Sequence, residues 1–400
     1  MYMRIEPIDD RRAATIRLSA ARLPLLVRAG LGLCVGFACT LNAGAQNAAA
    51  EAVPAEQTAA AAAQRNWRPP RFSWGDANLE GTFTSRDMQG IPMQRPEQFG
   101  TRQHLTEEEF NERLNSGPGG FAAFVTQQSE DESRIELSAL DSTETGTRVF
   151  GYTSYVIEPQ DGRVPAFTEE GRQRQGRGGG QANGPFFTTE DFSYYDRCIS
   201  RGVTGSIMPS LYGDAMRIVQ SPTEVAISYE MLHDTRIIPL DGRAQASQGV
   251  RQYMGSSVGH FEGDTLVVET TNFTDELAVG RMPHSEDLKL TERFTRIDPD
   301  MIDYVVTVDD PRTYQAPWTF RLTLTTQPGY EVLEYSCHEG NTFIRTALRA
   351  EQQYQQRVAD ARAKGEPIPE RPRARANAGG GIGIFAPPSE SEAVDIGTLQ

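Results

Sequence analysis

Between residues 203 and 340 the chain consists of short segments rich in β-branched and aromatic residues, with turn residues between them and no helical pattern. The runs expected to form strands are 216–220, 224–229, 236–239, 259–261, 265–271, 288–297, 303–308, 319–325 and 332–337. Successive strands without intervening helices pair in antiparallel fashion. The pattern therefore predicts a mainly β fold, an antiparallel meander that forms a closed or partly open barrel, with a few short helices. Closure is favoured because it removes exposed sheet edges.

An internal repeat extends the β interpretation into the first half of the chain. Residues 157–163 and 237–243 both read I-x-P-x-D-G-R, 80 residues apart. Each copy places a strand before a proline and an Asp-Gly turn, so we expect the same strand exit to be used twice. One short helix is also expected, because Thr106 and Glu109 form a capping box and Gly117 follows as a stop.

The first 45 residues have the three parts of an export signal. Six arginines precede a 13-residue apolar run, residues 29–41, and Ala43-Gly44-Ala45 provides a small-x-small cleavage site. The apolar run is shorter than the roughly 20 residues that cross a bilayer, so no integral membrane segment is expected after cleavage. We interpret residues 1–45 as a signal peptide and expect a periplasmic or secreted protein. The alternatives are twin-arginine export through Arg11-Arg12 and a lipid anchor at Cys39.

Removal of the signal leaves two cysteines, Cys198 and Cys337. In an oxidising compartment two cysteines most plausibly form one disulfide. The bridge would close a loop of about 140 residues and stabilise the fold by roughly 4–5 kcal/mol on the chain-entropy estimate. The alternative is a catalytic thiol, although neither cysteine belongs to a CxxC pair.

The composition of the remaining chain predicts its organisation. Residues 46–66 are rich in Ala and Gln and are expected to form a flexible leader, followed by a β-rich domain over 67–345. A Gly/Arg/Gln stretch at 171–184 is expected to be a mobile loop within that domain. Residues 346–364 have the composition of a solvated helix, and 365–400 that of a loosely ordered tail.

The charge of the chain argues against nucleic-acid binding. The full sequence carries a net charge of −15, and without residues 1–45 it has 33 basic and 51 acidic residues, a net charge of −18. A nucleic-acid partner needs clustered Lys and Arg to neutralise phosphates. The arginines of 171–184 raise the alternative of RNA binding, but a flexible surface loop explains them more simply.

Several segments resemble an uncharacterised family of secreted bacterial β-rich proteins. The segments that carry the resemblance are residues 78–83, 157–163, 230–243, 262–268, 271–273, 292–294 and 335–341. They span about 75–345, most of the mature chain. The family is similar to lipocalin-type barrels in its Gly-x-aromatic first strand and its meander, and the resemblance implies that architecture by analogy. His260-Phe261 departs from the basic-Trp pair of the family at that position. The resemblance supplies no activity.

Two histidine clusters at predicted strand ends are the candidate catalytic residues. The first contains His233, Asp234 and Arg236, and the second contains His338 and Glu339. A histidine beside a carboxylate and an arginine can act as a general base held in one tautomer. The strand ends of a barrel meet at its mouth, so both clusters are expected at one pocket. The alternative is a set of ion pairs and turn hydrogen bonds. Candidate substrate-binding residues are Glu230, Asn272 and Asn341.

Other chemistries lack their sequence signatures. The chain has no HExxH, CxxC, G-x-S-x-G or P-loop motif, so no metal and no cofactor is expected. A Ser-His-Asp triad stays open, because triads are defined by geometry rather than by order. His284-Ser285-Glu286 and Glu292-Arg293 are further residues that could join the site, with a solvated loop or a cross-strand salt bridge as the alternative.

Two functions are consistent with these features. The first is an exported β-barrel enzyme that acts on a small organic or carbohydrate-derived substrate by His/carboxylate acid–base chemistry, as a lyase, isomerase or hydrolase. The second is a non-catalytic protein of lipocalin-like type that binds a small ligand. Polar residues that converge inside the barrel favour the enzyme, whereas an apolar interior with polar groups only at the rim favours the binding protein.

Overall fold

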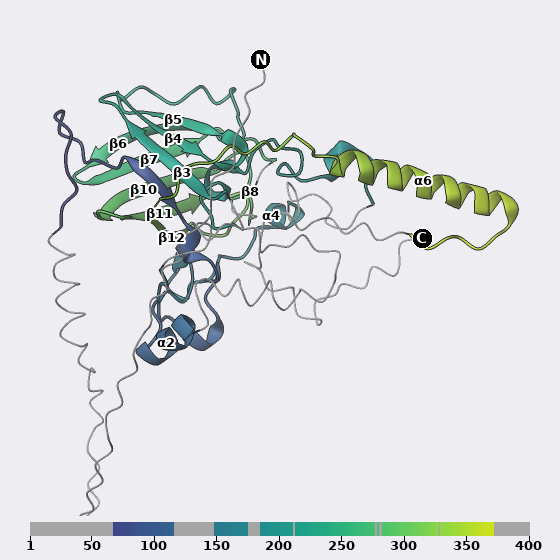
Figure 1. Cartoon of the computed structure of the whole chain (residues 1–400), viewed down its shortest axis with the longest axis horizontal. Coiled ribbons are helices and arrows are strands. Elements are labelled where there is room, and N and C mark those ends of the chain that lie inside the picture. The colour runs from purple at the N-terminus through teal and green to yellow at the C-terminus, as the bar shows by residue number, and fades with distance from the viewer. Residues whose placement is uncertain are drawn as a thin grey trace, which may run out of the picture. The chain divides into compact units, whose positions relative to one another are not determined.

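The computed structural model describes residues 67–115, 148–174, 185–210, 213–276, 278–279, 282–327 and 329–371. The protein is mainly antiparallel β sheet with few helices (Figure 1). The predicted signal peptide 1–45, the leader 46–66, most of the loop 171–184 and most of the tail 365–400 lie outside the described residues.

One large sheet contains ten of the strands. They are β1 (Gly81–Thr84), β2 (Val156–Glu158), β3 (Ala215–Gln220), β4 (Glu224–Tyr229), β5 (Thr235–Pro239), β6 (Ser256–Glu262), β7 (Thr265–Thr271), β10 (Lys289–Asp298), β11 (Met301–Asp309) and β12 (Trp318–Thr325). The short strands β8 (Ala278–Val279) and β9 (Met282–Pro283) form a separate hairpin between β7 and β10.

The sheet joins two runs of sequential strands through the first strand of the chain. Its order is β5-β4-β3-β1-β12-β11-β10-β7-β6, with β2 paired to β12. Strand β1 thus lies between β3 and β12, where Phe83 is opposite Met216 and Thr84 is opposite Thr325. All neighbouring strands are antiparallel. The predicted meander is therefore confirmed in its local pairing, while β1 was not recognised as its central link.

Alternation along the strands builds a single apolar face. Burial alternates residue by residue in β4, β10 and β11, as expected where one sheet face packs on a core. Phe294, Tyr304, Phe320 and Leu322 of this face are fully buried. The core therefore lies against one face of the sheet, and any charged residue on that face is removed from water.

The ladder does not close into a barrel, and a partly open sheet is the form compatible with the structure. Eight antiparallel steps leave the outermost strands, β5 and β6, running in the same direction. These two strands still contact each other through side chains. A Cβ atom on Gly259 would lie 2.8 Å from Cγ2 of Ile238, so only glycine allows this approach. Side-chain packing thus replaces the hydrogen bonds that a closed barrel would have there.

The helices are few and mostly short. They are η1 (Arg86–Met88), η2 (Glu97–Phe99), α2 (Glu107–Asn115), α4 (Glu169–Gln173), η6 (Thr189–Asp191), α5 (Gly202–Gly205), η7 (Met231–His233) and α6 (Phe343–Lys364). The capping box expected for α2 is present, because the backbone N–H of Glu109 donates to Thr106 Oγ1 (3.3 Å) and that of Thr106 donates to Glu109 Oε2 (2.8 Å). Helix α6 covers the range predicted from composition and begins three residues earlier.

Two local predictions are wrong. Residues 332–337 form no strand, because Val332 and Leu333 are exposed and the segment lies beyond the last paired strand. The start of the predicted mobile loop is ordered, since Gly171 belongs to α4 and is buried. A Cβ atom at Gly171 would lie 2.2 Å from the carbonyl oxygen of Thr313, so this glycine is a packing requirement rather than a flexible linker residue.

The repeated I-x-P-x-D-G-R segments adopt matching turns. Asp161 Oδ1 accepts from the backbone N–H of Arg163 (3.0 Å), and Asp241 Oδ1 accepts from that of Arg243 (3.1 Å). The glycine between them is left-handed in both copies. The Asp-Gly-Arg turns after β2 and β5 therefore match, whereas the prolines differ, because the Glu158-Pro159 bond is cis and Pro239 is the last residue of β5.

Candidate functional site

A pair of opposite charges lies on the buried face of the sheet. Arg236 in β5 forms two hydrogen bonds with Glu292 in β10, from Nη1 to Oε2 at 2.5 Å and from Nη2 to Oε1 at 2.9 Å. Their side chains are 4% and 0% exposed. The pair therefore links two strands that are far apart in the sheet order, across the apolar core.

Hydroxyl groups complete the surroundings of Glu292. Tyr304 of β11 donates to Glu292 Oε1 (2.9 Å), and Thr270 of β7 donates to Oε2 (3.4 Å). Ser257 of β6 lies within hydrogen-bond distance of the Thr270 hydroxyl (2.9 Å). Both oxygens of Glu292 are thus satisfied, as a buried carboxylate requires.

Tyr229 brings an unused polar atom to this place. It is the last residue of β4 and is 1% exposed, and its hydroxyl has no hydrogen-bond partner among the described residues. The charges that act on the hydroxyl are those of Arg236, Glu292 and Asp234, and Arg236 also lies within reach of a weak hydrogen bond to it. Nε of Arg236 is likewise buried without a partner. Most buried polar groups in proteins are paired, so these two neighbouring atoms, which lack a well-formed bond among the described residues, mark an incompletely satisfied polar place in the core.

Asp234 connects this place to the surface of the protein. It is half-buried at the start of β5, and its Oδ2 accepts a hydrogen bond from Ser200 Oγ (2.6 Å). Burial raises the pKa of Asp234, and the bond from Ser200 opposes that effect. We call Ser200, Tyr229, Asp234, Arg236, Thr270, Glu292 and Tyr304 the strand-end cluster. Two of its residues, Asp234 and Arg236, are among the predicted catalytic residues.

His233 does not belong to the strand-end cluster. It is exposed, and its Nε2 accepts a hydrogen bond from the backbone N–H of Tyr335 (3.0 Å). With Nε2 acting as an acceptor, the proton of the neutral ring is on Nδ1, so no nitrogen is left to serve as a base. Leu232 and His233 both have left-handed backbone angles, φ 65° and φ 56°, which is costly for residues with side chains. This turn sends His233 and Asp234 to different neighbours.

Glu230 lies in a second buried group of charges. Its carboxylate accepts from the hydroxyl of Tyr330 (2.6 and 2.9 Å), and burial raises its pKa. The nearby ion pair of Arg86 and Asp214 is fully buried, with 2.5 Å between Nη2 and Oδ1, and the Arg86 guanidinium lies 5.5 Å from the centre of the Tyr330 ring. Glu230 is therefore integrated into the core rather than presented to a substrate.

Three of the remaining predicted residues, His338, Glu339 and Asn341, follow the disulfide cysteine Cys337 in the chain. The predicted bridge between Cys198 and Cys337 is present. Asn341 Nδ2 donates to the carbonyl oxygen of Asp196 (3.1 Å) and thereby fastens the segment after the bridge. His338 and Glu339 are exposed on the turn that follows Cys337. Among the described residues neither has a hydrogen bond or ion pair with the strand-end cluster.

Asn272, the third predicted substrate-binding residue, lies apart from Glu230 and Asn341. Its Nδ2 donates to the carbonyl oxygens of Ala246 (2.7 Å) and Ser247 (3.1 Å), and its backbone is left-handed, with φ 60°. The side chain thus holds the loop that precedes β6.

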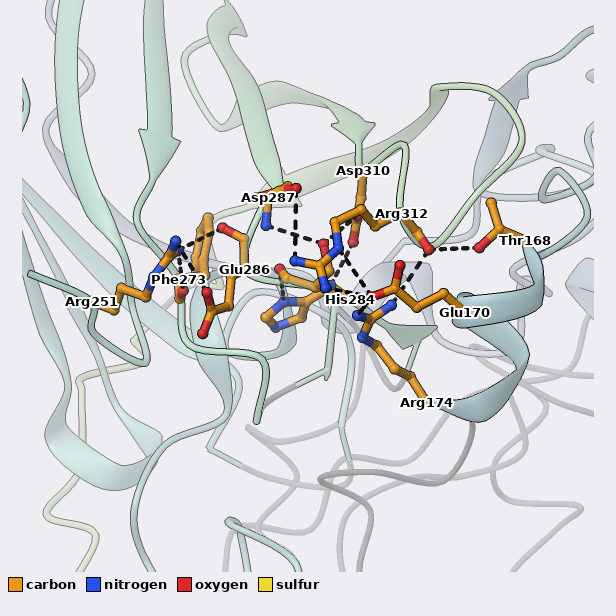
Figure 2. A network of polar contacts seen from close by, with 11 residues as sticks. Thr168, Glu170, Arg174, Arg251, Phe273, His284, Glu286, Asp287, Asp310 and Arg312 are labelled. Carbon is orange, nitrogen blue, oxygen red and sulfur yellow. Dashed lines mark hydrogen bonds and ion pairs between the residues drawn. The ribbon is translucent and has the colours of Figure 1, made fainter. Parts of the chain in front are cut away.

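A third polar group, the His284 network, surrounds His284, Ser285 and Asp310 (Figure 2). His284 is 3% exposed, and its ring packs edge-on against Phe273. Its Nδ1 is 3.0 Å from the carbonyl oxygen of Ser285. Ser285 in turn donates to Asp310 through both its backbone N–H (2.6 Å) and its hydroxyl (2.7 Å). Because the serine hydroxyl faces the carboxylate and not the imidazole, this is no Ser-His-Asp triad.

Arginines form the outer part of the His284 network. Glu170 of α4 accepts hydrogen bonds from both Arg312 and Arg174 (Figure 2). These bonds lower the pKa of Glu170 to about 2, with the larger effect from Arg312. Arg251 holds the neighbouring backbone by donating to the carbonyls of Phe273 (3.2 Å) and Glu286 (2.8 Å).

Other surface features of the described residues offer less chemistry. A pocket of about 320 Å³ lies between Phe186, Phe187 and one side of α6, where glutamines and the Arg371-paired Glu351 line it. No group of His, Cys, Asp and Glu in the described ranges is arranged to hold a metal ion. None of the helices within those ranges is long and apolar enough to cross a membrane.

Comparison with known proteins adds no functional information. The chain matches no protein-family model, no curated protein and no solved structure. The function is therefore argued from the geometry of the three polar groups.

The sequence did not predict Tyr229 as a site residue, and it predicted Glu292 only as a residue that could join the site. A signal for Glu292 was available, because Leu290, Glu292 and Phe294 alternate along one strand and place a carboxylate on the apolar face. Arg236 stands in the same relation to Ile238. Two opposite charges at buried strand positions predict a partnership, since neither is stable there alone.

Proposed function

We propose that the protein is an exported enzyme that performs acid–base chemistry on a small organic or carbohydrate-derived substrate at the strand-end cluster. The observation that carries the proposal is the buried hydroxyl of Tyr229, which has no well-formed hydrogen bond among the described residues and interacts with Arg236, Glu292 and Asp234. A hydroxyl or carbonyl oxygen of a substrate would complete these hydrogen bonds. The export signal and the resemblance to secreted β-rich proteins support the exported location.

Asp234 is the group proposed to exchange the proton. Its pKa is raised by burial, which brings a carboxylic acid closer to the range in which it both accepts and releases protons. Ser200 holds one carboxylate oxygen and thereby orients the other. Arg236 is fixed by Glu292 and supplies positive charge beside the hydroxyl of Tyr229. This assignment replaces His233, whose Nε2 is already occupied.

A non-catalytic ligand-binding protein is the second candidate. Two observations favour it. Arg236 and Glu292 form hydrogen bonds with each other, and most of the same sheet face is apolar. The strand-end cluster would then only orient a bound ligand. Asp234 separates the two candidates, since a binding protein does not depend on its proton.

The test combines binding with turnover. A panel of sugar lactones, uronates and hydroxy acids is incubated with the mature protein, and thermal stabilisation and chemical change of each compound are followed by fluorimetry and NMR. The variants are Tyr229→Phe and Asp234→Asn. The matched control is Tyr155→Phe, which removes a buried hydroxyl that is bonded to the Met88 carbonyl (2.6 Å) in another part of the core.

We expect Asp234→Asn to retain binding and to lower turnover by about 10²–10⁴-fold, the range for loss of a general acid or base. Tyr229→Phe should weaken binding, and Tyr155→Phe should leave both unchanged. Turnover that survives Asp234→Asn would contradict the enzymatic assignment. Binding that survives Tyr229→Phe would remove the cluster from both candidate functions.

A further inference from the structure

The pocket beside α6 shares no residue with the strand-end cluster or the His284 network. Two phenylalanines before η6 form one wall and one side of α6 forms the other, so that the lining residues are Phe186, Phe187, Glu351, Gln352, Gln355 and Gln356. The helix residues fall into two pairs at i and i+4, so they form one stripe along α6. The volume of about 320 Å³ lies at the lower end of the range for small-molecule sites. The cavity therefore brings an aromatic wall and an amide wall together at the size of a small ligand.

The aromatic wall consists of a fixed ring and an exposed ring. Phe186 is 3% exposed and stacks on Phe192, with 4.4 Å between the ring centres. Phe343 of α6 packs edge-on against both rings, at 6.2 and 5.5 Å. Phe187, in contrast, is 58% exposed. The buried rings hold the wall in place, and Phe187 offers apolar area that a ligand can still remove from water.

The amide wall presents hydrogen-bond acceptors. Gln355 Nε2 donates to Glu351 Oε1 (2.6 Å), and Gln356 Nε2 donates to Asp360 Oδ1 (2.8 Å). A carboxylate only accepts, so these bonds fix both amides with their oxygens directed elsewhere. Among the described residues those two amide oxygens have no hydrogen-bond partner, and Gln352 has no side-chain hydrogen bond at all. Hydroxyl groups of a ligand are suitable donors to such oxygens.

The charges at the pocket cancel. Glu351 is 9% exposed, and its second carboxylate oxygen is paired with Arg371. The chain reverses after the left-handed C-cap Gly365 and brings Arg371 back along α6, where its guanidinium lies 4.4 Å from the centre of the Tyr354 ring. A charged ligand would find no unpaired opposite charge among the lining residues, and an unpaired charge is costly to remove from water. The pocket therefore favours a neutral ligand.

We propose that this pocket binds the ring of a small neutral sugar. The C–H groups on one face of the ring lie against Phe187, and hydroxyl groups donate to the amide oxygens of Gln355 and Gln356 and bond to the amide of Gln352. Three amides on one wall require several hydroxyl groups on the ligand, which distinguishes a sugar from a phenol or a simple alcohol. The site holds a saccharide without acting on it, and it is independent of the proposed activity at the strand-end cluster.

The test titrates the mature protein with methyl glucoside, methyl galactoside and methyl mannoside, each alone, and follows saturation-transfer NMR signals of the ligand. Cyclohexanol is the comparison ligand, because it has a six-membered ring with one hydroxyl group. At least one glycoside should give a saturable signal and bind more tightly than cyclohexanol. The absence of a saturable signal from all three glycosides, or equal affinity for cyclohexanol, would overturn the proposal.

Two matched pairs of variants assign the signal to the pocket. Gln352→Ala should lower the affinity for the glycoside about three- to tenfold, the range for one neutral hydrogen bond, whereas Gln353→Ala changes the next residue of α6, which is exposed and outside the pocket, and should have no effect. Phe187→Ala should lower it about tenfold or more, because the ring loses its apolar contact. Leu333→Ala removes a side chain of similar exposure (56%) elsewhere and should have no effect.

The same titration in Tyr229→Phe separates this site from the strand-end cluster. A glycoside signal that persists in Tyr229→Phe and weakens in Phe187→Ala and Gln352→Ala belongs to the pocket, whatever the outcome for the proposed enzyme. A signal that is lost in Tyr229→Phe and unchanged in Phe187→Ala belongs to the strand-end cluster and overturns the pocket proposal alone. Equal losses in Gln352→Ala and Gln353→Ala would also overturn it, since the effect would then not depend on the amide wall.

Discussion

The strand-end cluster and the His284 network both combine buried arginines with carboxylates and a serine, yet they leave different atoms unused. In the strand-end cluster the cation and the carboxylate satisfy each other, and the free groups are the hydroxyl of Tyr229 and a single N–H of Arg236. In the His284 network one carboxylate is shared by two arginines, and the buried atom without a partner among the described residues is Nε of Arg174.

The kind of ligand expected at each place therefore depends on which buried polar atoms lack a partner and on the charges around them. A saturated ion pair beside a free hydroxyl favours a neutral oxygen, because a further charge there would be buried without a partner. Around His284 the carboxylates of Asp310 and Asp275 outnumber the one cation, Arg174, so a further anion is not favoured there. Burial alone does not distinguish the two places, since Arg236 and Arg174 are both nearly inaccessible.

Removal of the disulfide should have the largest effect on stability and should affect the two regions differently. Cys198 is two residues from Ser200, and Cys337 is two residues from Tyr335, so the bridge fastens the surroundings of Asp234 and His233 but no residue of the His284 network. Replacing both cysteines by Ser should lower the free energy of unfolding by up to about 4–5 kcal/mol, because a loop of 139 residues opens in the unfolded chain. Urea denaturation measures this loss. The His284 resonance should be unchanged under native conditions; a shift would show that the two regions are coupled.

Breaking the buried ion pair should have the next largest effect. Arg236→Met leaves Glu292 charged and unpaired in the core, which costs about 3–5 kcal/mol in comparable buried pairs. The double variant Arg236→Met/Glu292→Leu should recover most of that loss, because no charge is then buried. Denaturant midpoints of the single and double variants give the comparison. If Arg236→Met lowers the free energy of unfolding by less than about 1 kcal/mol, water reaches the ion pair.

Removing the unused hydroxyl should change stability little and in the opposite direction. Tyr229→Phe deletes a buried polar atom that has no well-formed hydrogen bond among the described residues, so we expect a gain of up to about 1 kcal/mol in the free energy of unfolding. Tyr155→Phe deletes a bonded hydroxyl and should lose about 1 kcal/mol. A loss in Tyr229→Phe equal to that in Tyr155→Phe would show that the hydroxyl of Tyr229 is paired in the folded protein.

Much of the fold could be predicted from the sequence, because strand alternation and turn residues are local signals. The runs that became β3, β4, β7 and β12 lie within a residue or so of their predicted ranges. The position of β1 between β3 and β12 could not be predicted, since it depends on pairing across more than 130 and 240 residues. The segment 332–337 misled because its composition is β-like while no strand is available to pair with it.

The candidate site was predicted only in its neighbourhood. Asp234 and Arg236 lie in one cluster, but a left-handed turn at Leu232 and His233 separates His233 from them, and single-sequence patterns do not show such a turn at residues other than glycine. The role of Arg174 was hidden for a different reason. It stands at the edge of a Gly/Arg/Gln stretch that composition marks as a loop, whereas packing of Gly171 against Thr313 orders the helix before it. Composition describes segments and does not resolve single contacts.

The smallest expected effect is the pH dependence that His284 confers on stability. Burial holds the pKa of His284 below its ordinary value of about 6.5, so the folded protein binds fewer protons at this residue than the unfolded chain does. Its contribution to stability is therefore fully present above pH 6.5 and is lost as the pH falls from there through the folded pKa. The charged groups that face the ring are Asp310, Asp275 and Arg174.

His284→Gln removes this titration and should make the free energy of unfolding less dependent on pH below about 6.5, measured by urea denaturation at half-unit intervals from pH 7.5 to 5. The matched control is His260→Gln, because His260 is exposed and bonded only to the exposed Glu262 (3.2 Å). The strand-end cluster contains no histidine, so Tyr229→Phe should leave the slope over the same pH range unchanged. A change of slope in that variant would mean that the two regions share a proton and are one site.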